Sequence, residues 1–379
     1  MQKIFSMKKV GILGGGQLGR MLLQAAANYP VETYVLEKDA ECPAAHLCSH
    51  FTKGDITSFK DVYHFGKNLD AITIEIESVN IEALKKLESE GVKVYPRPAA
   101  LEIIKSKSLQ KNFYKTNQIP TSPFVITSRK EDLQTQLHFL PAAHKLAVGG
   151  YDGRGVEILK NEKDIEKGFD EEAVLEKLVN IKKEIAIIVA ISENGKTAVY
   201  PPVEMIFNQD LNLLEYQLCP ANISEKMVWK AEAVALAVVK NFQSPGIFAV
   251  ELFVDIDDNV LVNETAPRVH NSGHHTIEAS YSSQFDMLWR IILNYPLGYT
   301  KSIMNSAMVN LVGEENYKGI AEYQNLPEVL KIENVFVHIY GKKETRPGRK
   351  MGHVTVLSNE RQELMHVANK VKQLLKVVS

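Results

Sequence analysis

The sequence predicts an α/β domain, followed by a larger α+β domain and a small C-terminal region. From Lys8 to Tyr95, apolar strand-like runs alternate with amphipathic helical runs, which is typical of a parallel sheet covered by helices. From residue 144 onward, several strand-like runs follow one another through short turns, which favours antiparallel pairing. The length of 379 residues also exceeds one ordinary domain of about 100–200 residues.

The N-terminal elements come in a regular order. We expect strands at 10–13, 32–36, 71–76 and 92–95, and helices at 18–29 and 81–91, from their apolar runs and helical periodicity. Pro96 and Pro98 interrupt this pattern, and a polar helix is expected from about Ala99 to Lys115. The first domain is therefore placed at residues 1–98.

The rest of the chain is expected to form two further domains. Strand-like runs occupy 144–148, 156–160, 173–177, 184–191, 197–201 and 246–256, and 223–242 is a long amphipathic helix. From about Lys301, strands are expected at 307–311, 334–339 and 352–356, with a closing helix at 360–376. These patterns predict domains at residues 99–300 and 301–379.

Composition excludes several classes of protein. Forty-four basic and 46 acidic side chains give a net charge of -2, so neither nucleic acid nor an anionic membrane is the expected partner. No uninterrupted apolar run approaches the length of about 18 residues that a membrane span needs. The cysteines are odd in number and form no C-x-x-C pair, which fits reduced thiols in a cytoplasm. We expect a cytoplasmic protein with small-molecule partners.

A glycine-rich turn follows the first predicted strand. Gly14, Gly16 and Gly19 fit G-x-G-x-x-G between a strand and a helix, and Glu37 ends the next strand-like run. That spacing is close to the offset of about 20 residues at which an acidic residue binds a dinucleotide ribose. Taken alone, this segment predicts a nicotinamide-dependent dehydrogenase. Two features further along the chain remain unexplained by that hypothesis.

The first of these features is a predicted β-hairpin with two glutamates. A turn centred between Asp257 and Asp258 places Glu251 opposite Glu264, and like charges at that separation repel. Magnesium held by such carboxylates and by substrate phosphates would remove the repulsion. Asn263 alternates to the other face and would join the site only through a bulge or twist. In another register, both glutamates would be ordinary solvent-facing residues.

The second feature is the glycine-rich loop 149–155 between two predicted strands, with Lys145 on the first strand. Glycines allow the backbone to approach a ligand, and successive N–H groups can cradle phosphate oxygens. The P-loop pattern is absent, and a plain surface turn is the alternative. A plain turn, however, has little use for the ring, carboxylate and guanidinium of Tyr151, Asp152 and Arg154.

Four motifs together resemble one family. GGGQLGRM, GGYDGRG, NETAPRVHNSGHHT and RPGRKMGH occur in this order along nearly the whole chain. The chain thereby resembles the ATP-grasp superfamily and, within it, the 5-(carboxyamino)imidazole ribonucleotide synthase family. The resemblance implies an N-terminal Rossmann-like pre-ATP-grasp domain, an ATP-grasp domain with ATP between two lobes, and a small C-terminal domain. It also implies a homodimer, which is common in the family.

The resemblance implies a ligase of de novo purine biosynthesis. Its substrates would be 5-aminoimidazole ribonucleotide, bicarbonate and MgATP, which react through carboxyphosphate to the N-carboxylated ribonucleotide, ADP and phosphate. Glu251 and Glu264 would hold Mg²⁺, Glu176 would read the adenine amino group, and Glu184 would accept from the ribose hydroxyls. The implied ATP-contacting residues are Lys107, Lys145, Gly150, Tyr151, Asp152, Gly153, Arg154, Gly155, Val156, Glu176, Lys177, Leu178, Val179, Glu184, Asn208, Asn263 and Glu264.

The resemblance also implies where the substrate binds. Arg346, Arg349 and Lys350 would hold the ribonucleotide phosphate. The other implied substrate-binding residues are Gly15, Gln17, Leu18, Glu77 and Ser272, and the catalytic residues are Tyr151, Asp152, Arg154, Arg268, His270 and Asn271. Arg268 would stabilise charge on carboxyphosphate, and His270 with Asn271 would orient it. The glycine turn would then meet the substrate through backbone groups, and Glu37 would merely end its strand.

Three positions depart from the family pattern. Lys107 stands where the family often has arginine, Asn208 where it often has histidine, and Val156 where glutamine is frequent. Two alternatives remain besides the dehydrogenase. One is a sibling ligase, such as formate-dependent glycinamide ribonucleotide transformylase or biotin carboxylase, although these lack GGYDGRG and RPGRKMGH in this form. The other is a non-catalytic nucleotide sensor, which the intact Lys145, Glu251, Glu264 and Arg268 disfavour.

Overall fold

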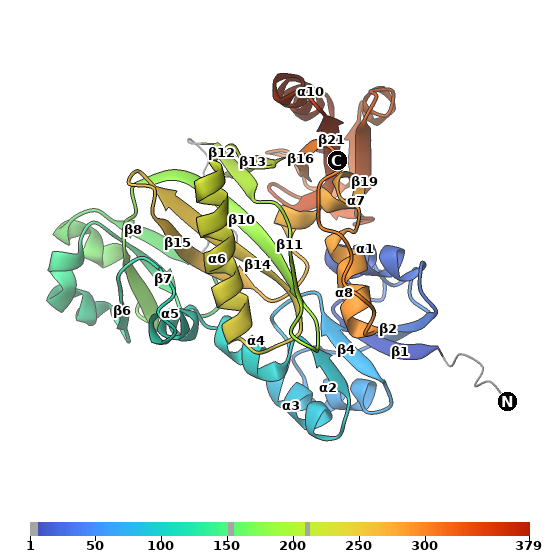
Figure 1. Cartoon of the computed structure of the whole chain (residues 1–379), viewed down its shortest axis with the longest axis horizontal. Coiled ribbons are helices and arrows are strands. Elements are labelled where there is room, and N and C mark those ends of the chain that lie inside the picture. Colours follow the sequence, from blue (N-terminus) through green and yellow to red (C-terminus); the bar gives the residue numbers. More distant parts are fainter. Residues whose placement is uncertain (1–6, 151–154, 209–212) are drawn as a thin grey trace.

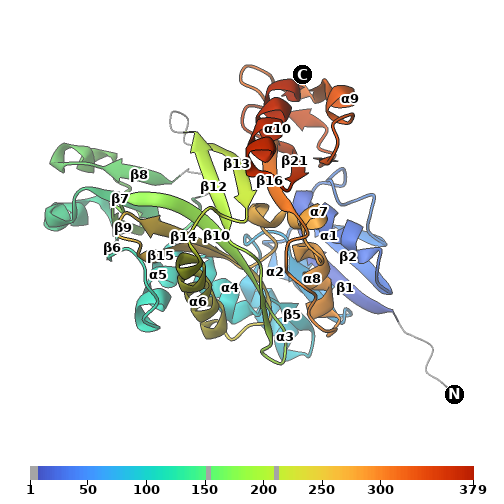
Figure 2. The same cartoon turned by 45° about the horizontal axis from the view of Figure 1, so that its top comes forward.

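The computed structural model describes residues 7–150, 155–208 and 213–379. The N-terminal sheet, the sheet of a small lobe and a long central sheet occupy different parts of the molecule (Figure 1). A second view places the small lobe at the opposite end of the central sheet from the N-terminal and C-terminal parts (Figure 2). Within the described segments, no helix is long and apolar enough to cross a membrane.

The N-terminal domain is the predicted parallel sheet with helices. Its strand order is β3-β2-β1-β4-β5, and all its pairings are parallel. The elements are β1 Lys8–Leu13, α1 Gln17–Ala26, β2 Val31–Glu37, β3 His50–Lys53, α2 Phe59–Gly66, β4 Ala71–Ile74, α3 Ile81–Ser89 and β5 Lys93–Tyr95. The sequence did not predict β3 and α2, which lack a long apolar run. Because β4 ends at Ile74, Glu75 and Glu77 lie in the loop beyond the strand.

The helix predicted at 99–115 is two helices. α4 Pro98–Ile104 ends before Ser106, whose hydroxyl accepts a hydrogen bond from the Leu109 amide and caps α5 Lys107–Thr116. A serine at this position begins a new helix because its side chain satisfies an otherwise unpaired amide. The break sets the start of α5 at Lys107.

The small lobe is a four-stranded antiparallel sheet of order β6-β9-β7-β8. Its elements are β6 Phe124–Thr127, η1 Lys130–Phe139, β7 Ala142–Leu146, β8 Val156–Leu159, η2 Glu162–Lys167 and β9 Ala173–Lys177. The predicted antiparallel pairing is confirmed, and the glycine-rich loop joins β7 to β8. Lys145 lies on β7, opposite Val156.

The central sheet has the order β15-β14-β10-β12-β13-β16-β21-β19, with β11 beside β10. These strands are β10 Ile181–Ile191, β11 Thr197–Val199, β12 Val203–Asn208, β13 Leu213–Cys219, β14 Gly246–Asp255, β15 Val260–Ala266, β16 Asn305–Val312, β19 Val335–Ile339 and β21 Lys350–Ser358. The long helix α6 Glu225–Asn241 covers one face, where Ala231, Ala235 and Val238 are fully buried. Small side chains let the helix approach the sheet closely.

The C-terminal region extends this central sheet. β13 pairs with β16, so one sheet crosses the domain boundary predicted at residue 301. The helix α10 Arg361–Leu374 covers β16 and β21. Between β15 and β16 lie η3 Asn271–Gly273, α7 Thr276–Ala279 and α8 Gln284–Ile292. The remaining elements of the C-terminal region are β17 Gly319–Ile320, β18 Glu322–Gln324, α9 Leu326–Val329, β20 Glu344–Thr345 and β22 Lys376–Val378.

One apolar core joins the N-terminal domain to the central sheet. Val10 and Leu22 belong to the same buried cluster as Ile188 and Trp289. The indole N–H of Trp289, on α8, donates to the carbonyl of Leu22, on α1, at 2.7 Å. Because dense packing leaves little freedom, this core fixes the glycine-rich turn before α1 relative to the residues after β15.

A candidate active site between the two lobes

The β14–β15 hairpin brings the two predicted glutamates face to face. Glu251 pairs with Glu264, which confirms the expected pairing, but the next pair toward the turn is Leu252 with Val262. Asn263 is therefore the extra residue of a β-bulge. The bulge turns Asn263 and Glu264 toward the same space, where Lys145 Nζ donates to Asn263 Oδ1 at 3.0 Å. The sequence predicted that Asn263 would join the site only through a bulge or twist, and this β-bulge brings it there.

The two glutamates differ in charge environment. The ammonium of Lys107, on α5, forms an ion pair with Glu264 and holds the pKa of that carboxyl below its usual range. Burial, together with the neighbouring carboxylates of Glu264 and Glu184, raises the pKa of Glu251. His270 Nε2 lies 3.8 Å from Glu251 Oε1. A cation between the two glutamates would favour the ionised form of Glu251 and oppose this rise in its pKa.

The oxygen atoms at the hairpin suit magnesium. Two facing carboxylates and one amide oxygen are hard ligands of the kind that Mg²⁺ prefers. No group of three or more His, Cys, Asp or Glu side chains with metal-binding geometry occurs in the described segments. The other ligands of an Mg²⁺ ion here would therefore be phosphate oxygens and water, as is usual for this metal.

Glu176, the predicted adenine contact, is held by two lysines. It lies on β9 and is 3% exposed. Its Oε2 is 2.9 Å from Lys111 Nζ, and its Oε1 is 3.2 Å from Lys145 Nζ. The sequence analysis missed Lys111, which is buried on α5 and whose pKa burial lowers to about 8. Its spacing of four residues from Lys107 could have indicated it, because such residues share a helix face.

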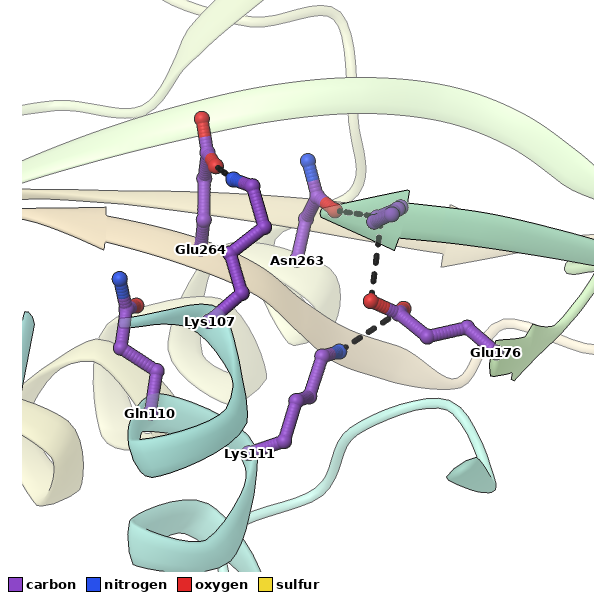
Figure 3. A pocket seen from close by; sticks show the side chains of 7 residues that line it. Lys107, Gln110, Lys111, Glu176, Asn263 and Glu264 are labelled. Carbon is purple, nitrogen blue, oxygen red and sulfur yellow. Dashed lines mark hydrogen bonds and ion pairs between the residues drawn. The ribbon is translucent and has the colours of Figure 1, made fainter. Parts of the chain in front are cut away.

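These side chains converge between the small lobe and the central sheet. Figure 3 shows Lys107 of α5 pointing at Glu264 of β15, Lys111 of α5 pointing at Glu176 of β9, and Asn263 beside Glu264. They surround a cavity of about 10 Å³, lined by Lys107, Gln110, Lys111, Lys145, Glu176, Asn263 and Glu264. That volume accommodates about one water molecule. Side chains from both lobes thus meet through ion pairs.

Other predicted nucleotide contacts lie around this centre. Glu184, on β10, is half-buried, and burial raises its pKa. The Lys177 and Leu178 amides donate to the Pro123 and Pro141 carbonyls, and Val179 follows them in the connection to β10. Gly150 and Gly155 flank the loop, and the Gly155 carbonyl accepts from Leu146. Tyr151, Asp152, Gly153 and Arg154 lie outside the described residues, as does the side chain of Asn208.

Predicted catalytic residues follow directly after β15. Arg268 Nε forms an ion pair with Glu77 Oε1 of the N-terminal domain at 3.0 Å, so these two predicted residues do meet. His270 Nδ1 and Ser272 Oγ are 3.0 Å apart. Asn271 Nδ2 donates to Asn310 Oδ1 on β16 at 2.8 Å. This segment therefore contacts all three parts of the chain.

The glycine-rich turn is engaged with carboxylates of its own domain. The Gly15 amide donates to Glu37 Oε2 at 3.1 Å, and the Gly15 carbonyl accepts from Ala44. Glu37 is therefore more than a strand end, contrary to expectation. Glu75 accepts from two further amides of the turn, those of Gly16 and Gly19. Gln17 and Leu18, the other predicted contacts here, begin α1.

The predicted phosphate clamp lies in the connection to β21. Arg349 Nη1 donates to the Glu344 carbonyl at 2.7 Å, while Arg346 is exposed. The positive charge of Lys350 lowers the pKa of Glu251 slightly, so Lys350 lies on the side of the clamp that faces the hairpin. The sequence analysis missed Lys342, which donates to the Lys350 carbonyl at 2.6 Å and whose pKa burial lowers to about 8. Its closeness in sequence to the RPGRK motif could have indicated that Lys342 belongs to the clamp.

Comparison with known proteins agrees with this geometry. Residues 7–105 match the ribonucleotide synthetase preATP-grasp domain, 112–285 the ATP-grasp domain, and 306–367 the phosphoribosylaminoimidazole carboxylase C-terminal domain. The N5-carboxyaminoimidazole ribonucleotide synthase of Aquifex aeolicus is 35% identical, over 98% of each chain. The chain belongs to the N5-carboxyaminoimidazole ribonucleotide synthase family. This is the family that the four motifs indicated, under a variant of the same name.

Solved structures of this family have the same fold. The Thermotoga maritima synthetase is 40% identical, with a TM-score of 0.91 over 98% of this chain and all of that one. The Aspergillus clavatus synthase, solved with ADP and 5-aminoimidazole ribonucleotide, is 31% identical, with a TM-score of 0.86 over 97% of this chain and all of that one.

Longer relatives share the same region. The phosphoribosylaminoimidazole carboxylase of Vigna aconitifolia is 36% identical over 92% of this chain. This chain spans 64% of that protein's length.

The dehydrogenase hypothesis is wrong for two reasons. The family is a ligase family, and the amides of the glycine-rich turn donate to carboxylates of the same domain.

Proposed function

We propose that this chain carboxylates 5-aminoimidazole ribonucleotide with bicarbonate and ATP, giving N5-carboxyaminoimidazole ribonucleotide, ADP and phosphate. The observation that carries the proposal is the continuity of the site from Lys145 through Glu264 to the Arg268–Glu77 ion pair. The cluster of lysines and carboxylates between the small lobe and the central sheet is thereby joined to the N-terminal domain. The full-length similarity to family members supports the same reaction.

At the nucleotide end, Lys145 and the amides of loop 150–155 would bind the ATP phosphates. A phosphate at Lys145 would replace Asn263 or Glu176 as its partner, and would free Glu176 for the adenine amino group. Glu251 and Glu264 would hold Mg²⁺, which would polarise the transferred phosphoryl group. Lys107 would then turn from Glu264 to a phosphate oxygen. Glu184 keeps its proposed role at the ribose hydroxyls.

At the reacting centre, Arg268 would stabilise the negative charge that develops on carboxyphosphate. Glu77 fixes the direction of that guanidinium through the ion pair. The contact between His270 Nδ1 and Ser272 holds the imidazole with Nε2 toward Glu251, where it would orient bicarbonate together with Asn271. Tyr151, Asp152 and Arg154, outside the described residues, remain proposed bicarbonate and substrate contacts.

At the substrate end, Arg346, Arg349 and Lys350 would bind the ribonucleotide phosphate by charge-assisted hydrogen bonds. Lys342 would add a cation, because it lies among their charges. Gly15, Gln17, Leu18 and Ser272 remain proposed substrate contacts. For its backbone amide or carbonyl to contact the substrate, Gly15 would have to give up its hydrogen bond to Glu37 or to Ala44.

Two expectations from the resemblance stay proposals alongside the reaction. We propose a homodimer that works in the cytoplasm on small molecules. Sedimentation velocity of the purified chain would measure the oligomeric state, and a single monomeric species across micromolar concentrations would contradict the dimer.

The reaction is tested by measuring ADP release with MgATP and bicarbonate, with and without 5-aminoimidazole ribonucleotide, while following the ribonucleotide itself. We expect strong stimulation of ADP release and equimolar loss of the ribonucleotide. Glu264→Gln should reduce kcat at least about 100-fold, because a metal ligand is lost. ADP release without consumption of the ribonucleotide would refute the proposal. Stimulation by glycinamide ribonucleotide with formate instead would indicate the sibling ligase.

A further inference from the structure

Glu75 occupies the N-terminal end of α1. Its side chain comes from the loop after β4 and is 9% exposed. Oε1 accepts from the Gly16 amide at 2.5 Å, and Oε2 accepts from the Gly19 amide at 2.7 Å. Both oxygens therefore act as acceptors for the first amides of the helix, which have no partners within it. Burial raises the pKa of Glu75, and the two N–H donors oppose this shift because they favour the ionised carboxylate.

A phosphate would use the same amides. In dinucleotide-binding folds, the glycine-rich turn places a pyrophosphate on the N-terminal amides of the following helix. Here the carboxylate of Glu75 makes these contacts. A side-chain anion of the same domain thus takes the position that the sequence pattern reserves for a ligand phosphate.

The glycines of the turn fit the carboxylate tightly. A Cβ added at Gly14 would lie 2.5 Å from Glu75 Cγ, and one at Gly16 would lie 2.5 Å from Glu75 Oε1. Gly14 also has a φ of +102°, which side chains other than glycine rarely adopt. The close approach of Glu75 thereby explains Gly14 and Gly16, whereas a Cβ at Gly19 would lie 3.0 Å from the Gly14 carbonyl oxygen.

Charges of both signs surround the turn: Arg268 lowers the pKa of Glu75, and Glu37 raises it. The positive charges of Arg268 and Lys342 lie near Glu75, and Glu37 accepts from the neighbouring Gly15 amide. A phosphate brought to the turn would meet two carboxylates that already hold the amides. Like charges in a buried space repel strongly, so the turn would not accept it.

We propose that Glu75 is a specificity residue whose carboxylate closes the phosphate position of the glycine-rich turn and holds the backbone of the turn in shape. The turn therefore rejects dinucleotides, although its sequence is typical of them. This inference concerns binding and stability and holds whichever substrate the centre uses. Only the kinetic measurement below rests on the proposed reaction.

The first test replaces the lost carboxylate from solution. Glu75→Ala removes a group whose shape acetate reproduces. We expect its Tm to fall by several degrees, and acetate to restore most of the loss in a saturable way, because an anion bound only to the folded state stabilises it. Acetamide, which is neutral, and chloride at equal ionic strength should not restore it. Restoration by acetamide or chloride as strong as by acetate, or no loss of Tm at all, would overturn the proposal.

Asp132→Ala is the matched control. Asp132 also accepts from two backbone amides, those of Ser128 and Arg129, but its side chain is 37% exposed, so water can replace it. Acetate should stabilise this variant no more than the unchanged protein. If Glu75→Ala is insoluble, the test uses Glu75→Gln instead. The NH₂ group of the glutamine would face one of the two N–H donors, so the Tm of this variant should fall, and acetate should not restore it. A Tm equal to that of the unchanged protein would contradict the inference.

Two binding measurements complete the test. Fluorescence titration with NADH should show no saturable binding to the unchanged protein, and micromolar binding would refute the closed turn. In the proposed reaction, Glu75→Ala should raise KM for 5-aminoimidazole ribonucleotide at least about tenfold with little change in KM for ATP, and acetate should lower it again. If the protein proves to lack this activity, the acetate and NADH results still decide the inference.

Discussion

At the scale of single residues, Glu176 and its two lysines show how a buried carboxylate stays ionised. A carboxylate that is 3% exposed would be strongly disfavoured without partners. The Lys145 and Lys111 ammonium groups hold its pKa below the usual range despite burial. Lys111 itself is almost inaccessible, so the pair depends on both partners being present. A ligand that takes Lys145 leaves Lys111 to keep Glu176 ionised.

We therefore expect Lys111→Met to weaken ATP binding about tenfold and to lower stability by about 3 kcal/mol, since it removes one partner of a buried ion pair. Competition with a fluorescent nucleotide and urea unfolding would measure these changes. Lys115→Met is the control, because Lys115 lies on the same helix but is exposed. Equal ATP affinity in both variants would show that Lys111 has no role in the nucleotide site.

The Arg268–Glu77 ion pair links two domains at 3.0 Å. If Glu77 acts by directing Arg268, the effects of Glu77→Gln and Arg268→Ala on kcat/KM should not add. We expect a coupling of about 1–2 kcal/mol in a double-mutant cycle. Additive losses would mean that each residue contacts the substrate independently.

At the scale of elements, the β-bulge at Asn263 decides the composition of the site. An unbroken strand would send Asn263 and Glu264 to opposite faces, whereas the bulge directs both toward Lys145 and Lys107. The bulge also compensates for the turn, since pairs nearer the turn, such as Val254 with Val260, are centred on Asp257. The predicted pairing of the glutamates was therefore correct only because the bulge shifts the register.

Deleting Asn263 tests this interpretation. The hairpin should then pair regularly with Glu264 still opposite Glu251, so KM for ATP should rise about tenfold, as in Asn263→Ala, while kcat falls far less than in Glu264→Gln. Steady-state kinetics of the three variants would measure this. A deletion as inactive as Glu264→Gln, beside an active Asn263→Ala, would show that the bulge itself positions Glu264.

At the scale of the whole molecule, several buried histidines lie in the cores of different parts of the chain. His274, His275 and His353 lie where the chain after β15 meets the C-terminal strands, and His144 lies in the small lobe; all are at most 2% exposed. The His274 and His353 rings are 4.8 Å apart, and His353 stacks on His338 at 4.4 Å. Burial lowers the pKa of His144 and of His275 to about 4, and it also lowers those of His274 and His353.

These pKa values predict acid sensitivity. In the unfolded chain, each histidine takes up a proton below about pH 6.5, while the folded chain resists until about pH 4. Stability is therefore complete above pH 6.5 and falls as the pH drops toward 4, by about 1.4 kcal/mol per pH unit for each histidine.

His144→Gln should reduce the pH dependence of the urea unfolding free energy between pH 6.5 and 5 by about one proton. His144 is suited to this test because only Thr127 and the Phe169 amide contact its ring nitrogens, among the residues that the structure describes. Unfolding curves at several pH values would measure the slope. An unchanged slope would show that His144 does not resist protonation.

The sequence by itself determined the features that depend on local pattern. Alternating apolar runs were enough for the parallel N-terminal sheet and the antiparallel lobe, because burial of one face imposes a period on each element. A turn between two apolar runs was enough to place Glu251 opposite Glu264. The family followed from four motifs in order. The predicted roles of individual site residues still await the experiments above.

Only the tertiary structure decided which distant groups meet. Nothing near Lys111 shows that Glu176 lies 2.9 Å away, and nothing near β13 shows that β16 continues its sheet. The glycine-rich turn is the clearest example. Its sequence is compatible with a dinucleotide, but Glu75, 59 residues after Gly16 in sequence, fills the phosphate position. Local sequence sets the backbone of the turn, whereas the Glu75 carboxylate that meets its amides comes from the loop after β4 and is placed there by folding.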